Sequence, residues 1–179
     1  MKYFTLLIFL CAYVGTISPA RAQLVVKANP GGLVLGMGAG SVEYFVAQNF
    51  SAQADVYLIP GVVHNDIDYS GWGAGLSGRI YALAQQRPSG VFLSPFVARH
   101  WVSFEDIRSV EHNYSFTALG GQLGYQWSPI HWLTLEGGGG VWTGLDVPTL
   151  KQTFGVTDYY GNGLNWYLNL GLGIVIWRP

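Results

Sequence analysis

Histidine and serine lie close together at two places in the sequence, and these side chains are suited to nucleophilic hydrolysis. His100, Ser103 and Glu105 form the first group, and His112 and Ser115 form the second. A serine becomes a nucleophile only when a histidine lies within hydrogen-bond reach and a further group orients that histidine. Closeness in sequence provides neither condition. We therefore expect no catalytic residues, and a lipid hydrolase remains an alternative function.

Five charged residues stand among glycine, serine and other small or polar residues. They are Lys27, Glu43, Asp55, Arg79 and Glu136. On the face assignment given below, each points into a barrel and lies four or five residues from the periplasmic end of its strand. We therefore expect one ionic layer across the lumen, in which Arg79 pairs with one or more of the three carboxylates. An eight-stranded barrel has room inside only for side chains, which favours a structural ion cluster over a gate or a proton-sensitive plug and argues against a wide pore. A narrow pore remains an alternative.

The elements that position these residues are strands, because apolar residues recur at every second position. The clearest case is the last segment, where Leu, Trp and Ile alternate from 164 to 176 with polar, small or aromatic residues. Most of the strands are about ten residues or longer, enough to cross a bilayer at a tilt. The sequence predicts eight strands, at 24–34, 39–47, 50–59, 70–83, 90–102, 113–127, 132–144 and 161–177.

The connections support an up-and-down arrangement. Short connections are expected around Gln48-Asn49, at 84–89 and at 128–131, and longer ones at 60–69, 103–112 and 145–160. This order is typical of periplasmic turns and extracellular loops. Residues 24–47 are divided at Gly36-Met37-Gly38, because single-chain bacterial barrels have even strand numbers. The predicted fold is an all-β, eight-stranded antiparallel up-and-down transmembrane β-barrel.

The orientation of the two strand faces separates a membrane barrel from a soluble, lipocalin-like binding barrel. One face is uniformly apolar, whereas the other combines charges with glycine, serine, glutamine and asparagine. A face of glycines and charges cannot form a dry core, but it can line a narrow lumen. The apolar face then meets lipid, where a closed barrel pairs every backbone polar group.

Tryptophans are expected near both ends of these strands, in the headgroup zone that they prefer. Three fall near predicted periplasmic ends and three near predicted outer ends. The periplasmic set is Trp127, Trp132 and Trp177, and the outer set is Trp72, Trp101 and Trp142.

The first 22 residues have the features of a cleaved secretory signal peptide. Lys2 precedes an apolar run from Leu6 to Val14, and Pro19-Ala20-Arg21-Ala22 supplies a cleavage pattern. The expected domains are a signal peptide at 1–22 and a barrel at 23–179. The single cysteine, Cys11, belongs to the signal, so neither disulfides nor thiol chemistry are expected. Only 11% of the 179 residues are charged, and no basic run suggests a nucleic-acid partner.

The start of the predicted barrel resembles small outer-membrane barrels of Gram-negative bacteria. The resemblance rests on Lys27 to Leu33 (KANPGGL), on Glu43-Tyr44 before a short turn, and on Phe50-Ser51 opening the next strand. More broadly, the chain is similar to eight-stranded barrels of the outer-membrane protein A and X type. The resemblance implies an outer-membrane location and no established enzymatic activity. Such barrels commonly end in an aromatic residue, whereas this chain ends in Trp177-Arg178-Pro179. The histidine-serine pattern of barrel enzymes that trim lipid A is absent.

The expected function is a structural, envelope-integrity or surface-binding role for a small barrel with a plugged lumen. The expected partners are outer-membrane lipid, lipopolysaccharide and the barrel-assembly machinery. No cofactor or metal is expected, and His64-Asn65-Asp66-Ile67-Asp68 lacks the spacing of a calcium loop. A solute, a ligand and an oligomeric state are left open.

Overall fold

The computed structural model describes residues 23–30, 38–64, 67–82, 89–105, 111–147 and 163–177. The expected signal peptide and most of the expected loop at 145–160 lie outside these ranges. Among the described residues, no helix is long and apolar enough to cross a membrane.

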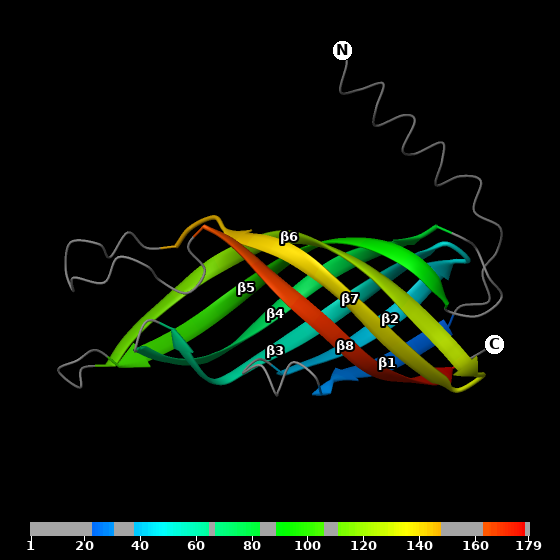
Figure 1. Cartoon of the computed structure of the whole chain (residues 1–179), viewed down its shortest axis with the longest axis horizontal. Coiled ribbons are helices and arrows are strands. Elements are labelled where there is room, and N and C mark those ends of the chain that lie inside the picture. Colours follow the sequence, from blue (N-terminus) through cyan, green and yellow to red (C-terminus); the bar gives the residue numbers. More distant parts are fainter. Residues whose placement is uncertain are drawn as a thin grey trace, which may run out of the picture.

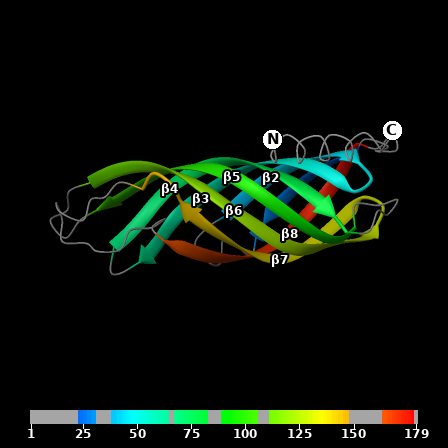
Figure 2. The same cartoon turned by 90° about the horizontal axis from the view of Figure 1, so that it is seen from above.

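Eight antiparallel strands form one closed barrel, as predicted (Figure 1). Each strand pairs with the next along the chain, and β1 pairs with β8 to close the ring. The view turned by 90° shows the strands crossing obliquely to the long axis (Figure 2). The strands are β1 (Gln23–Asn29), β2 (Gly38–Ala47), β3 (Phe50–His64), β4 (Ile67–Tyr81), β5 (Gly90–Glu105), β6 (Glu111–Ile130), β7 (Leu133–Gly144) and β8 (Leu164–Trp177).

The predicted division of residues 24–47 into two strands is confirmed, because Asn29 of β1 pairs with Ala39 of β2. The barrel end that carries Gln23, Trp177 and the turns at 48–49 and 131–132 is called the short-turn end below. The opposite end is called the loop end. β1 and β2 stay near the short-turn end, whereas β3 to β6 continue toward the loop end (Figure 1).

Two expected loops are largely strand instead. β3 and β4 continue pairing to His64 and Ile67, and β5 and β6 continue to Glu105 and Glu111. The expected loop at 60–69 is therefore wrong over most of its length, and the one at 103–112 is wrong at both of its ends, while 106–110 lie outside the described residues. Toward the loop end the outward positions become polar, so the apolar alternation fades although the backbone ladder continues.

Apolar side chains cover the outside of the barrel in the middle of the strands. Leu76, Leu93, Leu123, Leu168 and Leu170 are all more than half exposed. The inward positions of the same strands hold glycine, polar groups and aromatic rings. Phe92 is buried and Phe96 packs against a buried cluster, so both follow the alternation of β5 and face inward.

Two apolar clusters occupy the lumen at different heights. At the short-turn end, Val25, Phe45, Tyr81 and Phe92 pack together. Toward the loop end, a larger aromatic cluster contains Tyr69, Phe104, Tyr114, Phe116 and Trp142, with Ile59, Ala98, Val102 and Ala118 around them. The charged residues lie next to the first cluster, so β-strand alternation places them inside a packed interior.

Candidate functional site in the barrel lumen

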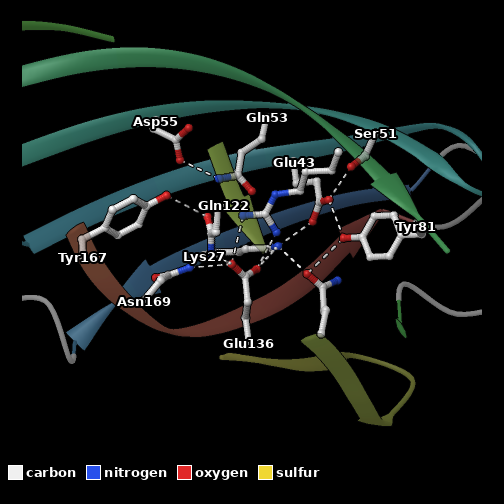
Figure 3. A network of polar contacts seen from close by, with 12 residues as sticks. Lys27, Glu43, Ser51, Gln53, Asp55, Tyr81, Gln122, Glu136, Tyr167 and Asn169 are labelled. Carbon is white, nitrogen blue, oxygen red and sulfur yellow. Dashed lines mark hydrogen bonds and ion pairs between the residues drawn. The ribbon is translucent and has the colours of Figure 1, made fainter. Parts of the chain in front are cut away.

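Lys27 lies at the centre of a buried polar network that joins β1 to three other strands (Figure 3). Its Nζ atom is 2.6 Å from Glu43 Oε2 and 2.7 Å from Glu136 Oε2. The same ammonium group donates a hydrogen bond of 2.5 Å to Gln126 Oε1. The contacts with Gln126 and Glu136 are hydrogen bonds, and the contact with Glu43 is an ion pair.

Arg79 completes the network from β4. Its guanidinium binds Glu136 in bidentate fashion, with Nη1 to Oε2 at 2.5 Å and Nη2 to Oε1 at 2.9 Å. Arg79 is 1% exposed, and its guanidinium carbon lies 4.4 Å from the centroid of the Phe92 ring. A planar guanidinium matches a carboxylate in this geometry and also stacks on an aromatic face.

Neutral side chains satisfy the remaining carboxylate oxygens. Tyr81 donates a hydrogen bond of 2.8 Å to Glu43 Oε1, and Ser51 donates to the same oxygen. Asn169 donates to Glu136 Oε1 at 2.6 Å. Buried charges are tolerated when they are paired and hydrogen-bonded in this way. We call Lys27, Glu43, Arg79 and Glu136, with these donors, the lumen ion network.

Asp55 is the member of the expected layer that this network does not include. Its Oδ1 accepts a hydrogen bond of 2.6 Å from Gln53, and within the described residues it makes no ion pair. The strand register explains the difference. Ser51 lies opposite Arg79, whereas Asp55 lies opposite Gly75, four residues farther toward the loop end. Counting residues from each turn does not capture this offset.

Gly124 makes room for the ring that supports Arg79. A Cβ atom at this position would lie 2.5 Å from Phe92 Cζ. Glycine on β6 therefore lets Phe92 of β5 lie flat against the wall, where the ring carries the guanidinium. The many lumen glycines are a signal of such close packing that the sequence already contained.

The candidate hydrolase groups are not assembled. His100 is buried inside the barrel, where its ring stacks on Phe116 at 5.0 Å. Ser103 lies three residues on and so falls on the opposite face of β5, where its hydroxyl donates to Asn113 Oδ1 at 2.5 Å. His112 contacts the Phe104 ring, while Ser115 accepts a hydrogen bond from Arg99. Neither histidine is hydrogen-bonded to its neighbouring serine.

The six tryptophans that were expected at the membrane interfaces do not all have the expected position. Trp72 and Trp101 are exposed on β4 and β5 and stack with centroids 4.2 Å apart. Trp127 and Trp132 are also exposed, near the turn between β6 and β7. The interface position expected for Trp142 is wrong, because its side chain is buried in the aromatic cluster beside His100. Trp177 lies in β8, and its side chain is outside the described set.

A second ion pair lies on the exterior, toward the loop end. Arg99 binds Asp146, and both side chains are more than a third exposed. The backbone N–H of Thr117 and the Arg99 guanidinium hold the pKa of Asp146 below its usual range. Arg99 also donates to Thr117 and Ser115, so the outer surface here is polar. In the described part of the chain, no group of three or more His, Asp or Glu side chains is placed to bind a metal ion.

Comparison with known proteins supports the fold. No protein-family model matches the sequence, and no curated protein matches it. Among solved structures, the chain is similar to the N-terminal β-barrel domain of Pseudomonas aeruginosa OprF, with a TM-score of 0.61 and 11% identity. That match covers 89% of this chain and 100% of the OprF domain. Neisserial surface protein A (NspA) matches with a TM-score of 0.55 and 15% identity, over 86% of this chain and 93% of NspA. The chain therefore has the fold of eight-stranded outer-membrane barrels.

Proposed function

We propose that this protein is a non-conducting barrel of the bacterial outer membrane with a structural or surface-binding role in the envelope. The supporting observation is the distribution of polarity between the two sides of one sheet. Glu43 and Arg79 are 0% and 1% exposed inside the barrel, whereas Leu123 and Leu170 are each 62% exposed outside it. A soluble barrel requires the reverse arrangement, because apolar surface is driven out of water.

The packing of the lumen supports a plugged barrel. The lumen ion network and the cluster around Phe92 occupy one end, and the aromatic cluster around Phe116 occupies the other. A continuous water path would have to break several buried ion pairs or displace aromatic rings. In this proposal, the outer face contacts outer-membrane lipid and lipopolysaccharide after the barrel-assembly machinery has inserted the protein.

Planar-bilayer recording tests the non-conducting state. The purified protein is reconstituted and recorded in salt solution over a range of voltages, with a preparation of boiled protein as the control. We expect no stepwise conductance above that control, because both ends of the lumen are filled. Regular single-channel steps would contradict the plug and favour the narrow pore.

A further inference from the structure

A cavity of about 320 Å³ lies between the two packed layers of the lumen. Arg79 and Glu136 border it on the side of the lumen ion network, and His100 and Trp142 border it on the side of the aromatic cluster. Its size falls at the lower end of the range for small-molecule sites. One packed apolar cluster lies toward each barrel end, so the position of the mouth of the cavity matters.

The cavity reaches the outer surface beside β8. Its lining includes Ala28, Trp166 and Leu168, which belong to the outward faces of β1 and β8. Outward side chains can line a lumen cavity only where the cavity passes the edge of a strand. The pairing explains how: β1 reaches only Leu172 of β8, so residues 164–171 of β8 pair with β7 alone within the described ranges.

Two titratable side chains at this cavity, Asp55 and His100, have few polar partners among the described residues, and His100 Nδ1 has none. Asp55 borders the cavity and, within the described residues, has no cationic partner. His100 is 5% exposed, borders the cavity and makes ring contacts but no hydrogen bond among the described residues. Buried polar groups are normally hydrogen-bonded, so such exceptions point to a missing partner.

Among the described residues, three buried carboxylates (Glu43, Asp55 and Glu136) share the lumen with two buried cations, Lys27 and Arg79. Lys27 and Arg79 are both engaged by Glu136, and Lys27 also by Glu43. Asp55 is left as the surplus carboxylate. Tyr57, Phe96 and Tyr167 border the same cavity and present aromatic surface, which attracts a cation.

We propose that this cavity binds an amphiphile carrying an amine, which enters from the membrane through the opening beside β8. Its ammonium group lies beside Asp55 within reach of His100, and its apolar chain leaves the barrel past Trp166 and Leu168. This inference rests on the proposed membrane location, because the opening faces the apolar exterior. An amphiphilic acid is disfavoured at the same place, since it adds a second unpaired carboxylate beside Asp55.

The test uses the protein in nanodiscs of phosphatidylcholine, with decylamine as the probe and decanoic acid and decanol as matched amphiphiles. The tryptophan indole signals are followed by ¹H–¹⁵N correlation spectra and assigned with Trp→Phe variants. We expect decylamine to give saturable shifts for Trp142 and Trp166, which border the cavity, and not for Trp127 and Trp132. Decanoic acid is expected to bind at least about tenfold more weakly, because it lacks the charge-assisted contact to Asp55.

Two variants locate the site. Asp55→Asn is expected to weaken decylamine binding by about tenfold or more while leaving decanol binding unchanged. Ala28→Phe at the opening is expected to abolish the saturable shifts, whereas Ala52→Phe, on the outward face of β3, is expected to leave them intact. Ala28→Phe adds apolar surface on the lipid side and leaves the lumen ion network untouched, so it tests the opening independently of Asp55.

Equal shifts of all tryptophans would overturn the proposal, because they indicate partition into the bilayer alone. Unchanged decylamine binding in both variants would overturn it as well. The heat-dependent electrophoretic mobility of each variant is recorded beside the spectra. A protein that keeps this mobility but binds no decylamine refutes the binding site and leaves the proposed barrel function standing. A protein that shows no heat-dependent mobility in any lipid refutes the proposed function itself.

Discussion

Replacing Arg79 with Ala is expected to lower the free energy of unfolding by about 3–5 kcal/mol, the usual cost of removing one partner from a buried ion pair. The guanidinium makes two hydrogen bonds to Glu136 and covers the Phe92 ring. Its removal leaves three lumen carboxylates with Lys27 as the remaining cation of the lumen ion network. The measurement is a urea titration of the reconstituted protein in lipid vesicles, followed by tryptophan fluorescence and by unheated gel mobility.

Arg99→Ala is the matched control for this variant. Arg99 also forms an ion pair with a carboxylate, but its side chain is 38% exposed, and solvent-exposed ion pairs contribute little to stability. A second variant, Arg79→Ala with Glu136→Gln, is expected to regain part of the lost stability, because it removes a carboxylate together with its partner. If Arg79→Ala is as stable as the parent protein, the lumen ion network does not hold the barrel together.

Replacing Leu123 with Arg is expected to cost about 2–4 kcal/mol, the range for a basic residue facing lipid near the bilayer midplane. Leu123 is 62% exposed on β6, where it pairs with Leu93 and Gly139 inside the apolar outer face. For a soluble protein, the same substitution at an exposed leucine is close to neutral. The measurement is the same urea titration in vesicles.

Leu145→Arg is the control that distinguishes a lipid-facing leucine from a water-facing one. Leu145 has the same exposed fraction, 62%, but lies beyond the end of β7 beside Asp146 and hydrogen-bonds through its backbone to Thr117. At this polar zone the cost is expected to be about 0–1 kcal/mol, as near a membrane interface. If both substitutions lower the free energy of unfolding equally, the claim that Leu123 faces lipid while Leu145 lies in the polar zone is contradicted.

Strand number and strand faces follow from the sequence because both depend on local alternation. Val141 faces outward, so strand alternation puts its neighbour Trp142 inside. The interface assignment of Trp142 considered its height along the strand and not its face. The continuation of β3 to β6 toward the loop end was not predicted for a different reason. Near the loop end the outer face carries polar groups such as Arg99, Ser103 and Asn113, so hydrophobic alternation no longer marks the strand.

The contacts of the site depend on pairing between strands, which a single sequence does not specify. Arg79 meets Glu136 because a closed, tilted barrel brings β4 and β7 to the same height across the lumen. Asp55 is displaced because Gly75, and not Arg79, lies opposite it. The lateral opening depends on how far β1 extends along β8, which is again a matter of register.

Folding in the presence and absence of lipid tests the central claim, that the leucine-rich outer surface of the barrel contacts a membrane. The unfolded protein is diluted from urea into buffer alone or into buffer with lipid vesicles, then floated on a density gradient and run on a gel without heating. We predict that it floats with the vesicles and forms a compact, faster-running band that disappears on boiling, and that it forms no such band in buffer alone. A folded, freely soluble monomer in buffer without lipid or detergent would contradict the account.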